Sequence, residues 1–503
     1  LLKILLVSSL LPIGSVYAKK SQEPDLKILG EISLLENLDE FKSSLFSQKP
    51  REEIQQVNNG EILAFDDFVK IVKDNHPDIV SAELSRQIAN SKRLEAQGAF
   101  DPSINSQNFF NRFNSSSAPG DAQEAFTSNT SVDFLTGYGA KFGLGAQFAQ
   151  GDIKTPVSPT GGAGEYFLMA QIPLLRDAIY NSQYIKEKSA KLNEVIADYL
   201  LFRAKLKTLD SGTKTYWNWV ASKKILDIET DLLNLVNGQV GFVEQQADLG
   251  NFPKISIVEA QREVQKRQGK VNSALRSLQA SSLDLSKFVW TNSGAPYAIP
   301  EPNQVPEEIP LPMVLIEDEV EDAKLNALVN RPEFKALDLS RDISNLERKL
   351  AKNQMLPQLD AYIKSGVETG EDSIGPAVKA GVNVSLPLRV RTAQGRKQQA
   401  ELKIKQLNLQ ERQLIQNVFL EIEDTASAVN TAYQKYLAAK KNYDLSLKLE
   451  EGEKDRFELG DSTLFLVIRR QRATVQANIE LIKTTADYHI AKLRFKLVQG
   501  ELI

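Results

Sequence analysis

The sequence has 503 residues, of which 25% are charged and 42% are hydrophobic, so it resembles neither a disordered chain nor a helical membrane protein. Apart from the extreme N-terminus, no stretch approaches eighteen consecutive apolar residues, which argues against a membrane-spanning helix. A formal net charge of −4 offers no basic surface for nucleic acid, and the absence of cysteine excludes disulfides and thiolate chemistry.

Residues 1–18 have the pattern of a signal peptide. A lysine supplies the positive start, residues 4–13 form an apolar core, and Ala18 is a small residue suited to cleavage. We therefore expect export from the cytoplasm. An interfacial helix is the alternative, which the proline and glycine in this segment would break. Residues 19–59 are polar and weakly patterned, and we expect a partly disordered N-terminal arm.

Residues 60–292 combine helical and strand patterns. Apolar residues at spacings of three and four predict helices over residues 62–74, 77–99, 176–248 and 255 to about 290. Between the second and third of these helices, residues 101–175 alternate with a period of two, which predicts β-strands. The helix over 176–248 keeps one apolar seam throughout, so we expect it to pack lengthwise against other helices.

The pattern then starts again after a proline-rich linker over residues 293–319. In residues 320–503 we predict a helix over 332–355, strands over 357–388, a long helix over 402–457 and a last helix over 464–498. The first strand region is longer than the second, and the extra length has room for a further hairpin that the sequence does not place.

Matching short segments indicate an internal duplication. The matching positions are Pro77 and Pro332 at helix starts, Pro173 and Pro387 at strand exits, and Gly250 and Gly460 at two turns between long helices. We therefore interpret residues 60–292 and 320–503 as two repeats, each with the order helix, strand pair, long helix, tip, helix.

The predicted strands have one apolar face and one small, polar face. In residues 138–148, for example, Phe142, Leu144 and Phe148 fall on one face, and glycines and polar residues fall on the other. This alternation suits a β-barrel in lipid with a wet lumen. Two strand pairs give about four spanning strands per chain, too few to close a barrel, so several chains must pool their strands. A soluble sheet with one face buried on protein is the alternative.

The long helices carry too much apolar seam to stand alone, and most of their other faces are polar. Arranged around an axis, such helices form a hollow, water-filled cylinder. A plain coiled-coil bundle is the alternative, and the strand pairs inserted at matched points between the helices argue against it.

Together, these features resemble the TolC-like outer membrane efflux proteins, over nearly the whole chain from about Gly60 to Val498. The resemblance implies a mainly α fold with membrane β-structure, in which a long α-helical coiled-coil barrel continues a trimeric, twelve-stranded β-barrel. It implies a homotrimer in outer membrane lipid that extends into the periplasm. It further implies passive export of small molecules or proteins in an efflux or type I secretion system, with a periplasmic adaptor and an inner-membrane pump as partners.

In this family the helix tips constrict the periplasmic entrance, and untwisting of the inner helices opens it. A family pattern at the tip has an aromatic residue, a glycine and often an arginine, at positions that here hold Phe457, Gly460 and Ser462. Well-known members carry aspartates six and nine residues after that glycine, which form an acidic ring. Here these positions hold Leu466 and Arg469, so the cation selectivity of those members is not expected.

At the first tip, the same offsets from Gly250 lead to Ser256 and Glu259. Glu259 and Arg469 thus occupy equivalent repeat positions. We hypothesise that they form an ion pair that holds the tips shut, so that charge reversal at either position changes leak conductance. Two separately solvated charges are the alternative, because exposed pairs contribute little.

No residues are expected to be catalytic or to hold a cofactor or metal. Gly460-Asp461-Ser462 resembles the nucleophile block of one esterase class, but Asp487 and His489 have the wrong spacing for its acid and base. The histidines lack companions for a metal site. The alternative function is a periplasmic adaptor or other coiled-coil scaffold of an envelope transport complex, which would need only one helical hairpin flanked by compact β domains.

Overall fold

The computed structural model describes residues 55–502, apart from residues 116–117, 153–159, 161, 315–317 and 370–375. These residues belong to one unit, Gln55–Ile503. The predicted signal peptide (1–18), all but the end of the predicted arm (19–59) and the turn expected between the strands of 357–388 lie outside the described residues.

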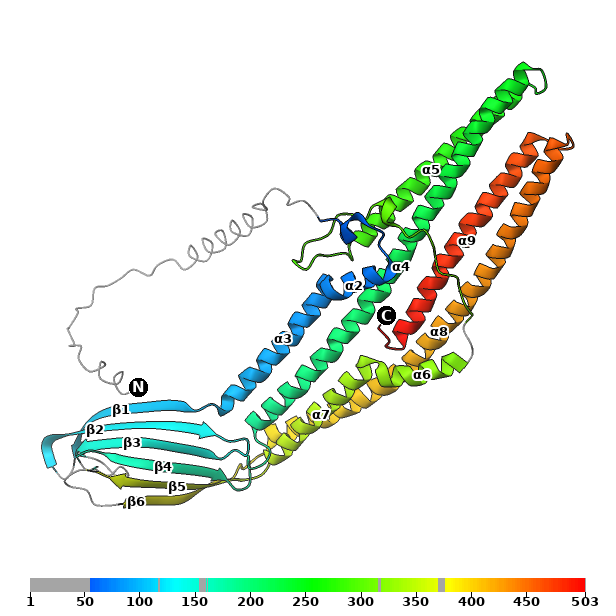
Figure 1. The fold of residues 1–503 in the computed structure, drawn as a ribbon. Coiled ribbons are helices and arrows are strands. Elements are labelled where there is room, and N and C mark those ends of the chain that lie inside the picture. Colours follow the sequence, from blue (N-terminus) through cyan, green and yellow to red (C-terminus); the bar gives the residue numbers. More distant parts are fainter. Residues whose placement is uncertain are drawn as a thin grey trace, which may run out of the picture. The chain divides into compact units, whose positions relative to one another are not determined.

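Two very long helical hairpins and one antiparallel sheet make up this unit (Figure 1). In chain order the elements are η1 (Val57–Gly60), α2 (Phe65–Asn75), α3 (Pro77–Gln97), η2 (Gly98–Phe100), β1 (Ser103–Ser115), β2 (Ala118–Leu135), β3 (Lys141–Gly151), β4 (Glu165–Pro173), α4 (Ser182–Asp248), α5 (Ile255–Ser286), η3 (Pro302–Gln304), α6 (Asp318–Asn330), α7 (Pro332–Asn353), β5 (Gln358–Glu368), β6 (Pro376–Ser385), α8 (Arg391–Glu458) and α9 (Leu464–Val498). α4 has 67 residues and α8 has 68. At 1.5 Å per residue each spans about 100 Å.

Local signals start the helices where the sequence predicts. Pro77 and Pro332 are the first residues of α3 and α7, where the missing N–H has no helical partner to lose. Asn181 caps α4, because its side-chain oxygen accepts a hydrogen bond from the Tyr184 N–H at 2.8 Å. The stretch from 176 to 181 is therefore a loop rather than the start of the helix, and Asp177 in it has a φ of 67°.

Two helical segments differ from the prediction. α8 begins at Arg391 rather than at residue 402, and α6 was not predicted. The first turns of α8 are almost entirely polar, so they carry no apolar seam by which periodicity could detect them.

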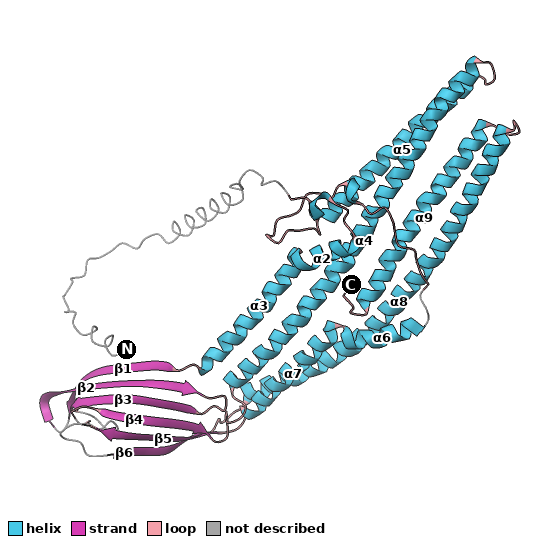
Figure 2. Cartoon of the chain, viewed as in Figure 1, coloured by secondary structure: helices cyan, strands magenta, loops and turns pink. Residues whose placement is uncertain are grey.

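The sheet contains six strands in the described part of the chain, in the order β1-β2-β3-β4-β5-β6, and all neighbours are antiparallel (Figure 2). The sheet thus has two strands more than the four that the two predicted strand pairs supply, and they form a further hairpin in the longer first strand region. The first strand region contains two hairpins, β1–β2 and β3–β4, and the second contains β5–β6. Nothing pairs with the outer edges of β1 and β6 within the described sheet.

The helices pack side by side in one open layer, whose members differ at its two ends. Nearer the sheet the order is α3-α4-α7-α8, and towards the hairpin ends it is α5-α4-α9-α8. Because β1 follows α3 and β6 precedes α8, the sheet and the adjoining helical layer have their open edges at corresponding ends: β1 and α3 at one, β6 and α8 at the other.

An aromatic core joins α2 to the middle of α4. The Phe65 ring stacks on Trp217 and the Phe68 ring on Tyr216, and the Tyr216 hydroxyl donates to the backbone carbonyl of Leu63 at 2.8 Å. The proline-rich segment also contacts the helices, because the Tyr488 hydroxyl of α9 donates to the Met313 carbonyl at 2.6 Å and accepts from its N–H at 3.0 Å. A second apolar cluster joins α6 and the start of α7 to α8 and α9.

Of the helices that the structure describes, none combines the length and apolar character needed to cross a membrane.

Candidate functional site

The two hairpins end in turns of the same geometry. We call residues 249–254 tip 1 and residues 459–463 tip 2. Gly250 and Gly460 have φ angles of 81° and 78°, in the left-handed region that favours glycine. At tip 1 the N–H groups of Gly250 and Asn251 donate to Ala247 and Gln246, and at tip 2 those of Gly460 and Asp461 donate to Phe457 and Arg456. Both are Schellman motifs, which satisfy the last carbonyls of a helix.

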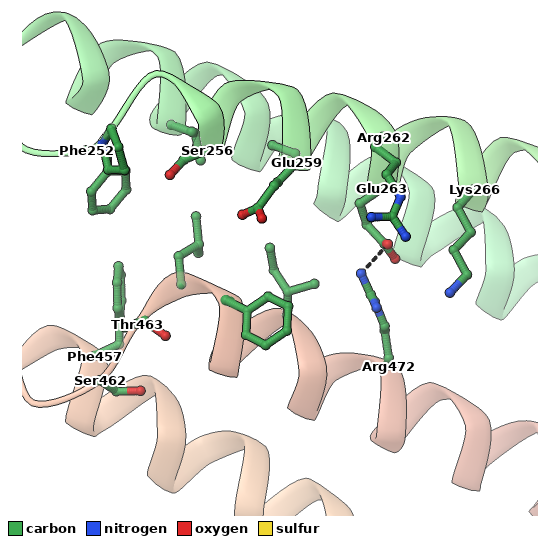
Figure 3. A pocket seen from close by; sticks show the side chains of 16 residues that line it. Phe252, Ser256, Glu259, Arg262, Glu263, Lys266, Phe457, Ser462, Thr463 and Arg472 are labelled. Carbon is green, nitrogen blue, oxygen red and sulfur yellow. Dashed lines mark hydrogen bonds and ion pairs between the residues drawn. The ribbon is translucent and has the colours of Figure 1, made fainter.

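A pocket of about 410 Å³ lies between the tips, with α5 on one side and α9 on the other (Figure 3). Its apolar lining includes Phe252, Phe457 and Phe465. Its charged lining comprises Glu259, Arg262, Glu263, Lys266 and Arg472. The pocket is therefore apolar near the turns and carries charges of both signs further along the helices.

An ion pair crosses this pocket from one hairpin to the other. Arg472 on α9 reaches Glu263 on α5 (Figure 3). The carboxylate of Glu263 also accepts from Arg267 at 2.8 Å, and Arg267 lies 3.7 Å from Glu229 on α4. Glu263, Arg267 and Glu229 are all buried, whereas the Arg472 side chain is 33% exposed. Two carboxylates and two guanidinium groups thus form a neutral cluster.

A second contact between the hairpins is uncharged. The Gln239 side chain on α4 donates to the Gln471 side chain on α9 at 3.0 Å, and Gln471 is buried. The hairpins are therefore joined near their ends by polar side chains, which can be exchanged for water when the helices separate. Such contacts suit a junction that opens and closes better than a continuous apolar seam would.

Tip 2 is tied to its own helix by a buried carboxylate. The hydroxyl of Ser462 donates to Glu453 on α8 at 2.6 Å, and the guanidinium of Arg470 on α9 donates to the same carboxylate at 3.4 Å. The Ser462 hydrogen bond, with help from Arg470, holds the pKa of Glu453 below its ordinary value of 4.5. The carboxylate is therefore charged at neutral pH and fixes the turn to both helices of the hairpin.

The candidate residues predicted from the sequence fall into three groups. Ser256, Glu259, Phe457 and Ser462 line the pocket. Gly250 and Gly460 form the turns. Leu466 and Arg469 lie on α9 outside the pocket lining.

The ion pair expected from the sequence is displaced by about one helical turn. Glu259 and Arg469 are both exposed and the structure records no ion pair between them, whereas Glu263 and Arg472 are paired. Sequence reasoning missed Glu263, Arg267 and Arg472. The spacing of four between Glu263 and Arg267 was the available signal, since it places opposite charges on one helix face.

His489, for which the sequence indicates no catalytic or metal-binding role, is buried in the core. His489 stacks on Trp217 with ring centroids 4.5 Å apart, and its Nε2 lies 2.7 Å from the Pro310 carbonyl. Burial lowers the pKa of His489 below its ordinary value of 6.5. Within the described ranges, no three His, Cys, Asp or Glu side chains gather as a metal site would require.

Comparison with known proteins identifies the fold. No protein-family model and no curated protein matches the sequence. Solved structures do match: the chain has the fold of the TolC-like outer membrane efflux channels, as the resemblance implied.

Three of these structures illustrate the likeness. The CmeC outer membrane channel of Campylobacter jejuni matches with a TM-score of 0.62 at 13% identity, over 97% of this chain and 94% of CmeC. The MtrE outer membrane channel of Neisseria gonorrhoeae, solved in an open state, has a TM-score of 0.60 at 13% identity, over 90% and 98% of the two chains. The outer membrane protein VceC of Vibrio cholerae has a TM-score of 0.60 at 14% identity, over 86% and 95%.

Proposed function

We propose that this protein is a passive exit duct of the bacterial outer membrane, through which an efflux or type I secretion system exports small molecules or proteins from the periplasmic side. Three copies assemble, their sheets close one barrel in outer membrane lipid, and their helices form a tunnel into the periplasm. A periplasmic adaptor protein and an inner-membrane pump are the partners. The observation that carries the proposal is an open sheet with an exposed apolar face, continued by an open layer of helices.

The two faces of the sheet differ as a membrane wall requires. On one face, large apolar side chains remain exposed in the single chain, among them Leu168 (67%) and Val382 (60%). On the other face, Lys364 donates to Gln147 at 2.9 Å and pairs with Glu165 at 3.4 Å. Apolar side chains that alternate with polar ones across a sheet suit lipid on one side and water on the other.

The open edges require further copies of the chain. In hydrocarbon, each unpaired backbone group along β1 and β6 would cost several kcal/mol. The helices at the same ends are also incomplete, because Leu84 and Ile88 of α3 and Leu402 and Leu409 of α8 leave more than half of their surface exposed. Two different edges that join head to tail close a ring, which supports a cyclic homo-oligomer. The TolC-like resemblance supports three copies.

The tips form the periplasmic gate of this duct. The pair between Glu263 and Arg472 holds the two hairpins of one chain together next to the pocket. Breaking the pair frees α5 and α4 to move away from α9. The partly exposed guanidinium of Arg472 is the member that solvent or a docked adaptor reaches first.

The adaptor or scaffold alternative fits the structure less well. An adaptor combines one helical hairpin with compact β domains, whereas the described chain has two hairpins and one open sheet with an exposed apolar face.

The proposal is tested by extracting the protein from outer membranes with detergent. We expect a threefold oligomer that dissociates on heating in denaturing gels and that conducts ions in a planar bilayer, while buffer with detergent alone does not conduct. A compact monomer in the aqueous fraction would refute the duct, and a water-soluble hairpin protein without conductance would favour the adaptor.

A further inference from the structure

The β1–β2 hairpin exceeds what a twelve-stranded barrel needs. Such a barrel takes four strands from each of three copies, whereas the described part of this chain forms a sheet of six. The extra pair lies at the edge that follows α3. The question is whether this hairpin belongs to the wall of the duct or lies beside it.

The hairpin is joined to the rest of the sheet along the full height of β3. β2 and β3 are in continuous register from Leu135 opposite Lys141 to Ala125 opposite Gly151. β3 has 11 residues, and a tilted strand needs about 9–11 residues to cross a bilayer. The β2–β3 pairing therefore extends over a complete membrane crossing and is not a local contact at one end.

The turn between β2 and β3 is fitted to the start of α4. The side chain of Asn181, which caps α4, donates to the backbone carbonyl of Gly137 at 2.9 Å. Gly139 has a φ of 77°, and a Cβ there would lie 2.4 Å from the backbone oxygen of Asp177. Only glycine fits this close approach. The extra strands are thus anchored at the junction of sheet and helices.

The side chains of the hairpin follow the two faces of the sheet. On the apolar face, the Phe134 ring stacks on Phe142 of β3 with centroids 5.6 Å apart. On the polar face, Asp133 accepts from Asn105 at 2.8 Å and from Ser131 at 3.0 Å.

Polar side chains also occur at mid-height on the apolar face, and several of them pair within the hairpin. The hydroxyls of Ser106 and Thr130 bond to each other at 2.9 Å, and the side-chain amide of Asn108 donates to Ser106 at 3.4 Å. These pairs lower the cost of placing this face of the hairpin in apolar surroundings.

We propose that β1 and β2 are part of the membrane wall, so that three copies close an eighteen-stranded barrel in which β6 of one copy pairs with β1 of the next. This inference rests on the proposed function. Six strands that alternate in direction leave β6 and β1 antiparallel where two copies meet, which keeps the whole barrel antiparallel with an even number of strands.

The added strands change the size of the exit. With strands about 4.8 Å apart and tilted by about 40°, eighteen strands enclose a backbone diameter of about 36 Å, against about 24 Å for twelve. The cross-section is roughly doubled at the same tilt. Cargo selection then falls to the tips, because the barrel is too wide to discriminate among small molecules. The barrel also admits bulkier cargo, such as a polypeptide, than a twelve-stranded wall of the same tilt.

Electron cryo-microscopy of the detergent-extracted oligomer tests the strand number directly. We expect a threefold particle with eighteen strands in the wall. A threefold particle with a twelve-stranded wall would overturn this inference and leave the duct intact. A monomer, or a particle without a barrel, would instead refute the proposed function.

Engineered cysteines supply a second test, because the chain has no cysteine of its own. Ser106→Cys on β1 is combined in turn with Val378→Cys and Val382→Cys on β6, and the same β6 positions are combined with Ala146→Cys on β3 as matched controls. All four side chains lie on the apolar face of the sheet.

If β6 meets β1 of the next copy, oxidation in intact membranes gives covalent multimers with Ser106→Cys and none with Ala146→Cys. Within one chain, β3 and β6 are three strands apart, or about 14 Å, too far for a disulfide. Covalent multimers with Ala146→Cys but not with Ser106→Cys would place β3 at the junction between copies and overturn the inference.

Discussion

If the tips gate the duct as proposed, replacing Arg472 by glutamine should favour their open arrangement. The substitution removes the charge that reaches Glu263 across the pocket, and leaves two buried carboxylates, Glu263 and Glu229, to share Arg267. The closed arrangement loses an ion pair, whereas in the separated arrangement both groups are hydrated and lose little. The substitution therefore acts mainly on the closed state.

The size of the effect follows from the exposure of the two partners. A hydrogen bond to a charged group contributes about 1.5–3 kcal/mol, and a fully exposed ion pair less than about 1 kcal/mol. Glu263 is buried, but one third of the Arg472 side chain is exposed, which favours the lower end of the first range. About 1.5 kcal/mol per chain corresponds to about a tenfold shift of the opening equilibrium for each hairpin pair.

Leak conductance in a planar bilayer measures this shift. We expect Arg472→Gln and Glu263→Gln each to raise the open probability by about tenfold or more. The free-energy effect of the double variant should be smaller than the sum of the two single effects, because the two residues contact each other. Arg262→Gln is the matched control, since Arg262 lines the same pocket and forms no ion pair among the described residues. It should leak like the wild type.

Wild-type leak in Arg472→Gln, or equal leak in Arg472→Gln and Arg262→Gln, would refute the assignment of the gate contact. Charge reversal at Glu259 and Arg469 tests the ion pair expected from the sequence. Wild-type leak in both reversed variants would reject that pair without affecting the one between Glu263 and Arg472.

Three further outcomes are expected. Gly460→Ala should destabilise tip 2 by about 1–2 kcal/mol, because Gly460 has a φ of 78°. Gly452→Ala inside α8 should instead stabilise the helix by up to about 1 kcal/mol. Urea midpoints of the two variants that shift in the same direction would contradict this. The pKa of Glu453 is lowered in the folded protein, so the charged carboxylate stabilises tip 2 fully above pH 4.5, and this stabilisation is lost as the pH falls further. Leak should therefore rise on acidification below pH 4.5. Glu453→Gln should leak more at neutral pH and lose that pH dependence. Tyr216→Phe should cost about 1–2 kcal/mol in thermal or urea unfolding by leaving the buried Leu63 carbonyl without its donor, and an unchanged stability would show that water replaces the hydroxyl.

Much of the fold could be predicted because the sequence signals for its helices and turns are local. The apolar seams of the long helices, the prolines at Pro77 and Pro332 and the glycines at Gly250 and Gly460 act within a few residues of themselves. The start of α8 was missed for the same reason, since its first turns are polar and carry no periodic signal.

The turns at Gly250 and Gly460 were predicted from the sequence, but the contacts between the hairpins were not. Offsets from the turn glycines led to Glu259 and Arg469, one turn away from the side chains that meet, Glu263 and Arg472. Which charges meet depends on how α5 and α9 are rotated and shifted relative to each other, and that is set by packing along the whole length of α4 and α8.

By itself, the sequence determined where the long helices, the two turns between them and most of the strands lie, because hydrophobic period, capping and turn residues are short-range properties of the chain. Only the tertiary structure decided how many strands share the sheet, which edges are left open and which buried charges pair between the hairpins. These depend on hydrogen bonds and packing between segments distant in sequence, such as the contact of Asn181 with Gly137 and that of Arg472 with Glu263. No local pattern encodes the register of two long elements against each other.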